Sequence, residues 1–438
     1  MDNIYAVSHY PENVIDGRII QSSTSFRHLS KVKANKIKED PELKWPTSQL
    51  ELIRVSTIVK RSINRPAGMF VNSSASDAKR HFSKCVLVTG GAGFIGSHVV
   101  VALVEKYPEW QIINLDKLEK CSSLKNVSAV EHCSNYKFIQ GDVCDLYLIN
   151  CLFETEEIDI VFHFAARSHV DDSFRCPMEF QSVNVEGTRV LLQAAHKAGV
   201  KRFIYASTDE VYGESTKQEH DEFSPRRPTN PYSASKAAAE SAVLFYWKKY
   251  RFPVIVTRSN NVYGPNQYLE KVIPKFISLL EQNKKCTIQG TGLQSRHFLY
   301  ATDATEAFLT VLERGDPGEI YNVGSDFELS IIQLARQLIK LMKSTSMLTD
   351  PDDWLSFIKD RPHNDLRYPM NWDKLRMLGW KPRVTWQEGI RRTVDWYKEN
   401  PEHWCTEECG VRISQPQTQK QPGILRAPYP PQHLCDFT

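Results

Sequence analysis

CVLVTGGAGFIGSH, residues 85–98, is the stretch that decides the fold of this chain. A short apolar run leads into glycines at positions 90, 93 and 96, and an apolar segment that suits a helix follows. In a strand, turn and helix of this kind, Gly90 permits a tight turn, Gly93 lets the backbone approach a pyrophosphate, and Gly96 lets helix and sheet close up. The N-terminus of the helix then directs backbone N–H groups at the phosphates. The stretch predicts a dinucleotide-binding unit rather than a glycine-rich turn without a ligand.

Short apolar runs recur at the spacing of an α/β protein. We expect further strands over residues 111–116, 136–142, 158–166, 201–208 and 252–259. Runs that are apolar on both faces suit parallel strands covered by helices. Residues 184–200 supply one such helix, with Leu191, Leu192 and Ala195 on one face and Gly199 at its C-terminal end. The sequence therefore predicts a Rossmann-type α/β fold with a doubly wound parallel sheet.

An acidic residue ends the second of these runs. Asp116 follows Gly96 by 20 residues, where a carboxylate is expected to bind the hydroxyls of an adenosine ribose. A carboxylate there would repel a 2′-phosphate, so NAD is favoured over NADP as the cofactor. Asp142, at the end of the third run, is placed to meet the adenine edge.

The segment PTNPYSASKAAAESAV, residues 228–243, predicts a helix that carries a base. Asn230 suits the N-cap and Pro231 the first helical position, so Tyr232 and Lys236 fall at i and i+4 on one face. A nearby ammonium lowers the pKa of a phenol because it favours the phenolate. Tyr232 is therefore expected to take a hydroxyl proton near neutral pH.

Two adjacent acids occur in YASTDEVYG, residues 205–213, after an apolar run that ends in hydroxyl side chains. A solvated turn is the ordinary reading of Asp209 and Glu210. Beside a catalytic Tyr/Lys pair, a catalytic role for the two acids is a second interpretation. Burial and mutual repulsion can keep one carboxyl protonated while the other is ionised. Such a pair provides both an acid and a base.

Composition narrows the class of protein. The chain has 438 residues, enough for two hydrophobic cores, and its net charge of +3 with 24% charged residues forms no basic stripe or acidic block. We therefore expect a small-molecule partner and neither nucleic acid nor a membrane. No apolar run is long enough to span a bilayer and the N-terminus does not read as a signal peptide, so we expect a cytoplasmic protein. The ten cysteines are scattered, and HWCTEEC near the C-terminus matches no common zinc module, so no metal site is expected.

The chain divides into four expected segments. Residues 1–83 read as a poorly ordered extension and residues 405–438 as a disordered tail rich in Pro and Gln. Residues 84–261 form the expected NAD-binding domain, to which later segments return. Residues 262–404 form a smaller, mixed lobe, mainly for substrate, with a helix within LSIIQLARQLIKLM, residues 329–342.

Over residues 84–400 the chain resembles the extended short-chain dehydrogenase/reductase family, and within it the nucleotide-sugar 4,6-dehydratases. The resemblance rests on an ordered set of motifs: TGGAGFIGSH, NLDKL, QGDVCD, HFAARSHVDDS, STDEVYG, PTNPYSASKAAAE, RSNNVYGPNQYLEKVIP and GTGLQSRHFLYATD. It implies a homodimer built on helices of the sheet domain. It favours dTDP-glucose as the nucleotide sugar, although the sequence itself does not distinguish dTDP from UDP.

The resemblance also assigns chemical roles. Tyr232, supported by Lys236, would take the proton of the sugar 4-hydroxyl, held by Thr208, as hydride leaves C4 for NAD. Glu210 would then remove the C5 proton and Asp209 would protonate the departing C6 hydroxyl. Return of the hydride to C6 gives a 4-keto-6-deoxy sugar, so NAD is regenerated in each cycle.

The remaining implied contacts divide between cofactor and substrate. Beside the glycines, Asp116 and Asp142, the cofactor residues are Phe94, Ile95, Lys117, Val143, Ala165 and Ala166, together with Tyr232 and Lys236. Asn261, Lys271 and Arg296 would bind substrate, and the guanidinium of Arg296 suits a diphosphate. Arg167 departs from the Glu or Gln usual in the family and changes the charge near the cofactor ribose, with an effect on affinity that the sequence leaves open.

Two other functions remain open at this point. One is a nucleotide-sugar 4-epimerase or decarboxylase of the same family, in which Glu210 would not be needed to remove a C5 proton. The other is an NAD-binding module without catalytic activity, which would have no use for Tyr232, Asp209 and Glu210 together.

Overall fold

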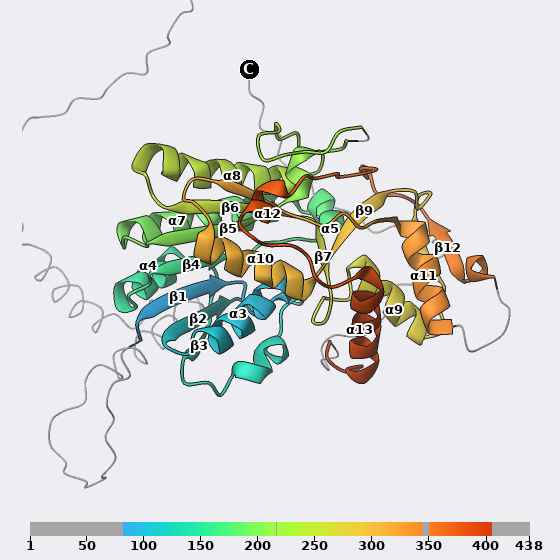
Figure 1. Ribbon diagram of the computed structural model, residues 1–438, viewed down its shortest axis with the longest axis horizontal. Helices are drawn as coiled ribbons and strands as arrows, with labels where there is room; N and C mark the ends of the chain where they lie inside the picture. The colour runs from blue at the N-terminus through green and yellow to red at the C-terminus, as the bar shows by residue number, and fades with distance from the viewer. Residues whose placement is uncertain (1–81, 216, 344–349, 405–438) are drawn as a thin grey trace, which may run out of the picture. The chain divides into compact units, whose positions relative to one another are not determined.

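The structure, a computed structural model, describes residues 82–215, 217–343 and 350–404 (Figure 1). Apart from residues 82 and 83, the extension expected over residues 1–83 lies outside these ranges. The tail expected over residues 405–438, which includes most of the HWCTEEC segment, also lies outside them.

A seven-stranded sheet in the order β10-β6-β5-β4-β1-β2-β3 forms the centre of the described residues. Its strands are β1 (Lys84–Thr89), β2 (Trp110–Asp116), β3 (Tyr136–Gln140), β4 (Ile160–His163), β5 (Arg202–Thr208), β6 (Val254–Ser259) and β10 (Ile320–Val323). All neighbouring strands run parallel. The chain winds outward from β1 to β3 on one side and from β4 to β10 on the other, which confirms the predicted doubly wound fold.

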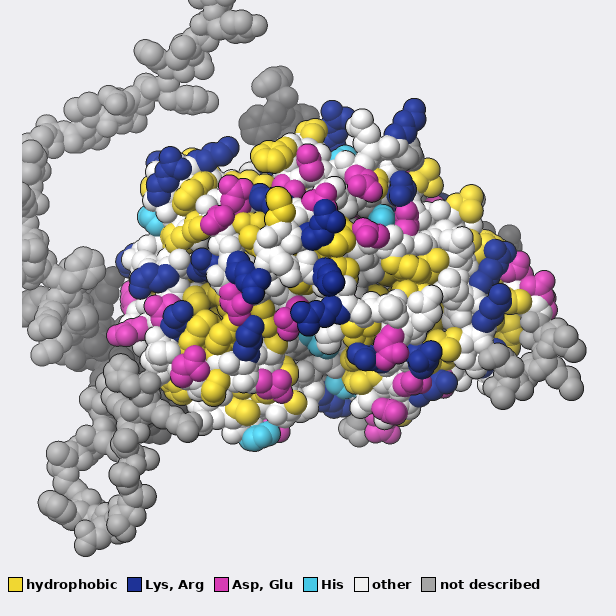
Figure 2. Space-filling view, viewed as in Figure 1, with side chains coloured by type: hydrophobic (Ala, Val, Ile, Leu, Met, Phe, Trp, Pro, Cys, Tyr) yellow, Lys and Arg dark blue, Asp and Glu magenta, His cyan; other side chains and the backbone are white. Residues whose placement is uncertain are grey.

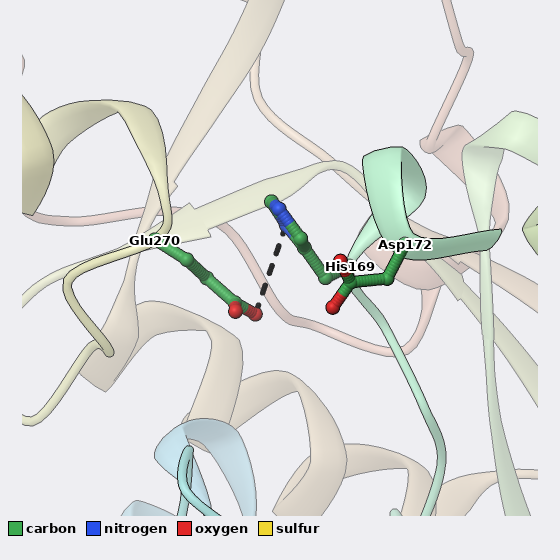
Figure 3. A group of neighbouring side chains, drawn as sticks. All are labelled: His169, Asp172 and Glu270. Atoms are coloured by element: carbon green, nitrogen blue, oxygen red, sulfur yellow. Dashed lines mark ion pairs between the residues drawn. The ribbon is translucent and has the colours of Figure 1, made fainter. Parts of the chain in front are cut away.

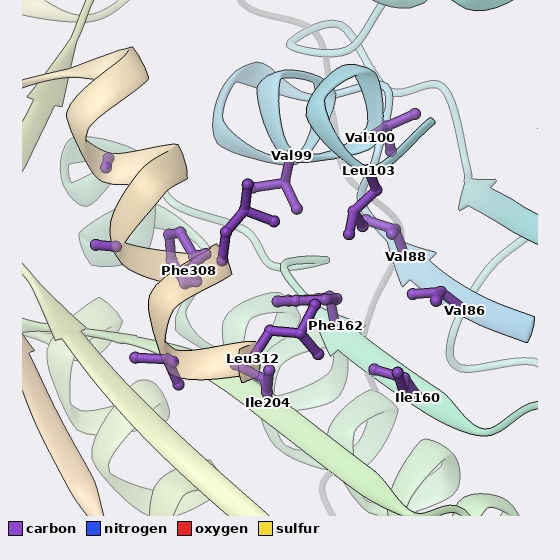
Figure 4. Close-up of a cluster of buried hydrophobic side chains, with 14 of the residues drawn as sticks. Val86, Val88, Val99, Val100, Leu103, Ile160, Phe162, Ile204, Phe308 and Leu312 are labelled. Atoms are coloured by element: carbon purple, nitrogen blue, oxygen red, sulfur yellow. The ribbon is translucent and has the colours of Figure 1, made fainter. Parts of the chain in front are cut away.

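Helices cover both faces of this sheet, as continuous apolar strands require. On β1, Val86 and Val88 face α3 (Phe94–Lys106) and α10 (Ala301–Arg314), whereas Leu87 faces α4 (Leu146–Thr155), α7 (Thr188–Lys197) and α8 (Pro231–Tyr250). In Figure 4, Phe308 and Leu312 of α10 lie with Val99 and Leu103 of α3 over Phe162 and Ile204 of the sheet. Burial of each such side chain contributes roughly 1.5–3 kcal/mol.

A second group of elements has its own core. It contains α9 (Val272–Glu281), α11 (Ile331–Lys343) and α13 (Trp386–Glu399), the pair β8 (Cys286–Gln289) and β12 (Leu355–Ile358), and the sheet β11 (Glu328–Ser330), β9 (Ser295–Tyr300), β7 (Asn261–Tyr263). Figure 1 shows α9, α11 and α13 gathered beyond one end of the large sheet. Phe276, Leu334 and Trp386 are buried together here. The helix expected over residues 329–342 is α11.

The surface carries charges of both signs. Figure 2 shows Lys and Arg side chains interspersed with Asp and Glu over the face in view. None of the described helices combines the length and apolar character needed to cross a membrane.

Candidate active site

A cavity of about 470 Å³ opens at the carboxyl ends of the central strands, and residues of both groups of elements line it. Such a position is where doubly wound sheets bind ligands, at the point where the strand order reverses between β1 and β4. Nearly every residue expected at the site lines this cavity: Gly90, Gly93, Phe94, Ile95, Gly96, Asp116, Lys117, Asp142, Val143, Ala165, Ala166, Thr208, Glu210, Tyr232, Lys236, Asn261, Lys271 and Arg296. Asp209 is the exception and lies behind the cavity wall.

The glycine loop between β1 and α3 is a cradle with no room for side chains. Gly90 has a φ of +72°, and a Cβ there would lie 2.6 Å from the Ala165 nitrogen. A Cβ on Gly96 would lie 2.2 Å from the Gly90 oxygen. The N-cap of α3 is Gly93, which provides no side-chain cap, and the first turn of the helix holds no acidic residue. The backbone N–H groups of this first turn are therefore free to bind an anion. The loop therefore fits a dinucleotide pyrophosphate.

The acids expected near the adenosine are held by the backbone and by a lysine. Asp116 accepts hydrogen bonds from the N–H of Ala92 at 3.0 Å and of Leu118 at 2.8 Å, which fixes its carboxylate beside the glycine loop. Lys117 Nζ lies 3.0 Å from Asp142, so the ends of β2 and β3 are joined by an ion pair at the cavity. These contacts give the adenosine end of the cavity a defined shape.

The helix α8 begins as the sequence predicts, with Asn230 at its N-cap and Pro231 in its first turn. The Asn230 side chain accepts a hydrogen bond from the Ser233 N–H at 2.8 Å, and its Nδ2 donates to Glu210 Oε2 at 2.9 Å. One side chain therefore caps the helix that carries Tyr232 and holds the carboxylate of Glu210. Sequence analysis identified the cap, but the second contact joins segments 20 residues apart and had no local signal.

Tyr232 and Lys236 both line the cavity, yet their electrostatics differ from the sequence expectation. Burial raises the pKa of Tyr232, and the charge of Glu210 raises it further. Lys236 Nζ donates to the Ala206 carbonyl at 2.7 Å and lies 4.3 Å from the centre of the Tyr205 ring. Burial lowers the pKa of Lys236 to about 7. The expected lowering of the phenol pKa is wrong for the ligand-free protein, because desolvation outweighs a lysine that is bound to the backbone.

Asp209 follows β5 and is 2% exposed. Its Oδ2 accepts a hydrogen bond from Asn260 Nδ2 at 2.9 Å, and its Oδ1 lies 3.2 Å from Thr208 Oγ1. Burial raises the pKa of Asp209 to about 7 and the neighbouring Glu210 adds to this effect, while the Asn260 hydrogen bond and the charge of Arg296 oppose it. A substantial fraction of Asp209 is therefore protonated near neutral pH, as an acid catalyst requires.

Several positioning residues escaped sequence analysis. Glu240 on α8 accepts a hydrogen bond from Ser207 at 3.0 Å and pairs with the buried Arg258 of β6. Asn184 donates to Ser235 at 2.9 Å and accepts a hydrogen bond from the Arg167 N–H at 2.8 Å. These contacts fix α8 against β5 and β6 and against the loop after β4. The irregular π-helical turn at Gln181–Gly187, which places Asn184, has no recognisable sequence signature.

The residues expected at the substrate side lie at the end of the cavity nearer the second group of elements. Arg296 of β9 donates to the carbonyls of Ser295 and Asp365 and lies 4.7 Å from the centre of the Tyr368 ring. Lys271 donates to the Ser168 carbonyl at 2.8 Å, and Asn261 begins β7. Arg296 and Lys271 therefore place positive charge at this end.

The side chain of Arg167 lies in an ion-pair network. Its guanidinium lies 2.8 Å from Glu179 and 3.7 Å from Glu119, and Glu119 also pairs with Lys117. The positive charge introduced at this position is therefore balanced within the protein.

His169, Asp172 and Glu270 form a group beside the cavity whose potential ligand atoms lie within 4.8 Å of one another (Figure 3). Figure 3 shows the His169 ring directed toward Glu270, 3.7 Å away. Lys120 Nζ lies 3.4 Å from Asp172 and 3.6 Å from Glu270. An internal cation already neutralises these carboxylates, so the group is an ion-pair network and supports no metal proposal.

A glycine cradle and a Tyr/Lys helix facing one cavity of a doubly wound sheet define an enzyme of the extended short-chain dehydrogenase/reductase class. The family model for GDP-mannose 4,6-dehydratase matches residues 87–393, and the chain belongs to this family.

Named relatives and a solved structure agree with this membership. The chain is 61% identical over 323 residues to a dTDP-D-glucose 4,6-dehydratase from Mus musculus, which covers 74% of this chain and 91% of the relative. It is 46% identical over 344 residues to a trifunctional UDP-glucose 4,6-dehydratase/UDP-4-keto-6-deoxy-D-glucose 3,5-epimerase/UDP-4-keto-L-rhamnose-reductase from Arabidopsis thaliana, covering 78% of this chain and 51% of the relative. A dTDP-glucose 4,6-dehydratase from Streptomyces venezuelae, solved with NAD bound, aligns with a TM-score of 0.69 at 38% identity, covering 73% of this chain and 98% of the other.

Proposed function

We propose that the protein catalyses the NAD-dependent dehydration of dTDP-glucose to the 4-keto-6-deoxy sugar. The observation that carries the proposal is the pair of adjacent acids at the end of β5. Asp209 is buried and its pKa is raised to about 7, whereas Glu210 lines the same cavity as Tyr232 and Lys236. An acid and a base are thus available next to Tyr232, the residue that would accept the hydroxyl proton when the sugar is oxidised at C4. The mouse and Streptomyces relatives are named for this reaction.

NAD fits the cradle formed by Gly90, Gly93 and Gly96, and Asp116 selects against a 2′-phosphate. When bound, it would supply a hydride acceptor and a positive charge that favours the ionised phenol. Lys117 and Asp142 would lie beside the adenosine of the cofactor. The small side chains of Ala165 and Ala166 permit its close approach. Phe94, Ile95 and Val143 contribute the apolar part of this wall.

In the first half of the reaction Tyr232 accepts the proton of the sugar 4-hydroxyl, which Thr208 orients by a hydrogen bond. The C4 hydrogen leaves as hydride, and the resulting ketone acidifies the hydrogen on C5. Glu210, held by Asn230, then removes the C5 proton. Asp209 gives its proton to the C6 hydroxyl and water leaves. The hydride then returns to C6 while Glu210 returns its proton to C5, which gives the 4-keto-6-deoxy sugar.

The second group of elements, within residues 262–404, would hold most of the nucleotide sugar. Arg296 and Lys271 border the cavity with positive charge, which suits a diphosphate. Asn261, the first residue of β7, lines the same cavity. This division agrees with the separate cores of the two groups.

The test is mass spectrometry of products after the purified protein is incubated separately with dTDP-glucose and UDP-glucose. We expect loss of one water from dTDP-glucose, and no loss in Glu210→Gln. Glu219→Gln, an exposed glutamate on the segment after β5, is the matched control and should react like the wild type. Water loss from UDP-glucose alone would transfer the proposal to the UDP sugar, the substrate named for the Arabidopsis relative.

The same experiment separates the alternatives. An unchanged mass with inverted C4 would identify a 4-epimerase. A third incubation, with a nucleotide-linked uronic acid, would identify a decarboxylase by loss of carbon dioxide. Bound NAD without turnover of any nucleotide sugar would identify a binding module.

We also propose that the protein is a cytoplasmic homodimer. On α8 the residues Ala234, Ala238, Ser241 and Phe245 form an exposed stripe at helical spacing, which suits packing against a second copy. Sedimentation velocity would measure the oligomeric state, and Phe245→Glu should shift it toward the monomer. The seven cysteines of the described residues are free thiols, in keeping with a reducing compartment.

A further inference from the structure

Asn260, which neither the sequence nor the comparisons assign to the site, contacts the buried acid directly. It follows β6, is 4% exposed and lines the cavity. Its Nδ2 donates to Asp209 Oδ2 at 2.9 Å. Together with Thr208, it supplies the hydrogen bonds that the described residues make to the Asp209 carboxyl.

The orientation of the Asn260 amide is determined by its other contacts. The side-chain Oδ1 of Asn260 accepts a hydrogen bond from the Ser325 backbone N–H at 3.2 Å. The backbone N–H of Asn260 donates to the Val323 carbonyl at 2.9 Å and so fixes the main chain. A backbone N–H can only donate, so the atom that faces Ser325 must be the amide oxygen. The NH₂ group must therefore face Asp209, at any pH at which the protein is folded.

This fixed donor determines which oxygen of Asp209 can carry a proton. Oδ2 already accepts a hydrogen bond from an amide N–H, so a proton on Oδ2 would compete with that N–H for the same region. Oδ1 accepts a hydrogen bond from Thr208 Oγ1 at 3.2 Å, but a hydroxyl, unlike the fixed NH₂ group, can rotate and accept instead, so the proton is favoured on Oδ1. Thr208 lines the cavity, so a proton on Oδ1 faces a hydroxyl of the cavity wall that can pass it on, whereas a proton on Oδ2 would face only the amide N–H.

We propose that Asn260 is a positioning residue for the acid step, because its amide directs the proton of Asp209 onto Oδ1, toward Thr208 and the cavity. This inference rests on the proposed function. When the Asp209 O–H bond breaks and the C6 hydroxyl leaves as water, a carboxylate remains behind the cavity wall. The Asn260 N–H then stabilises this buried negative charge, which is the state in which a hydrogen bond of this kind is strongest.

The proposal has a direct test in the titration of the Asp209 carboxyl. Carbon-13 NMR of protein labelled at aspartate carboxyls would follow this group, with Asp209→Asn identifying its signal. Removal of the amide in Asn260→Leu, which keeps the side-chain volume, should move the titration midpoint upward by about one pH unit. Glu210, which raises the pKa, and Arg296, which lowers it, remain in the variant, as does Tyr232 on the facing helix.

A second readout concerns the reaction itself. With dTDP-glucose in deuterated water, Asn260→Leu should still exchange the C5 hydrogen, while water loss falls about ten-fold. Asn322→Ala is the control, because Asn322 is a fully buried asparagine whose side chain makes three hydrogen bonds, none of them to Asp209. It should affect thermal stability without separating exchange from water loss.

An unchanged titration midpoint of the Asp209 carboxyl in a folded Asn260→Leu protein would overturn the proposal. So would an Asn260→Leu protein in which C5 hydrogen exchange and water loss fall by the same factor, as any fall in Asn322→Ala should. If the wild type releases no water from any nucleotide glucose, the proposed function fails instead. The carboxyl titration would still decide whether Asn260 controls Asp209.

Discussion

The two ends of the cavity are built on different principles. The cradle from Gly90 to Gly96 lies within one strand, turn and helix, and it works through backbone N–H groups and the absence of side chains. The acid–base end collects Asp209 and Glu210 after β5, Tyr232 on α8 and Asn260 after β6, and both acids are held by side-chain hydrogen bonds. A local backbone feature can be recognised from a short motif, whereas a constellation of side chains depends on how distant segments pack.

The largest expected effect distinguishes chemistry from binding. Tyr232→Phe removes the hydroxyl that accepts the sugar proton, and we expect product formation to fall about a thousand-fold. NAD affinity, measured by fluorescence titration, should change little because the cradle is untouched. Tyr246→Phe on the same helix is the control and should leave both quantities unchanged. A large loss of NAD affinity in Tyr232→Phe would mean that the two ends are not independent.

A change in the cradle should have the opposite signature. The added Cβ of Gly96→Ala would lie 2.2 Å from the Gly90 oxygen, so the loop must move, and we expect NAD affinity to fall about a hundred-fold. Gly199→Ala is the control, because Gly199 has a φ of +73° that strains an alanine, but its Cβ would meet no atom within 4 Å. It should lower thermal stability slightly and leave NAD binding intact. Equal losses in the two variants would contradict the role of the cradle.

The pH dependence of water loss should report the acid–base end of the cavity, and comparison with Asp209→Asn isolates the contribution of Asp209 to stability. Asp209 must be protonated to act, and its pKa is raised to about 7, so water loss should decline by up to ten-fold per pH unit above that value. The unfolded chain releases this proton at its ordinary, lower pKa, so Asp209 also makes the free energy of unfolding decrease as pH rises toward 7. Asp209→Asn should abolish this decrease. A thermal unfolding series in both proteins would measure it, and parallel curves would contradict the raised pKa.

The smallest expected effect concerns Asn230, which belongs to both local and tertiary structure. Asn230→Ala removes an N-cap, which should cost about 1 kcal/mol of unfolding free energy, measured by urea denaturation. It also frees Glu210, so water loss should slow several-fold beyond any effect on stability. Asn230→Ser restores a cap without reaching Glu210 and should recover stability but not the rate. Recovery of both would show that the contact with Glu210 is unimportant.

Much of the fold followed from local patterns. Local sequence patterns predicted the apolar strands, the N-cap at Asn230 and the helix α11. They could do so because each of these elements is stabilised by neighbouring residues and by burial of its apolar faces. The short strand β10 was not assigned, because four residues are too few to show a periodic pattern, and its place follows from pairing with β6 and burial in the core. The division into lobes remains a proposal.

The sequence by itself determined that the chain forms a doubly wound sheet, that a glycine cradle follows its first strand, and which residue types stand ready for acid–base chemistry. Only the tertiary structure decided their states. It bound Lys236 to the Ala206 carbonyl, placed Asp209 behind the cavity wall, and brought Asn230 and Asn260 to the two acids. The physical reason is that a periodic pattern records which faces are buried, while the pKa of a group depends on desolvation and on neighbours that packing brings from elsewhere in the chain.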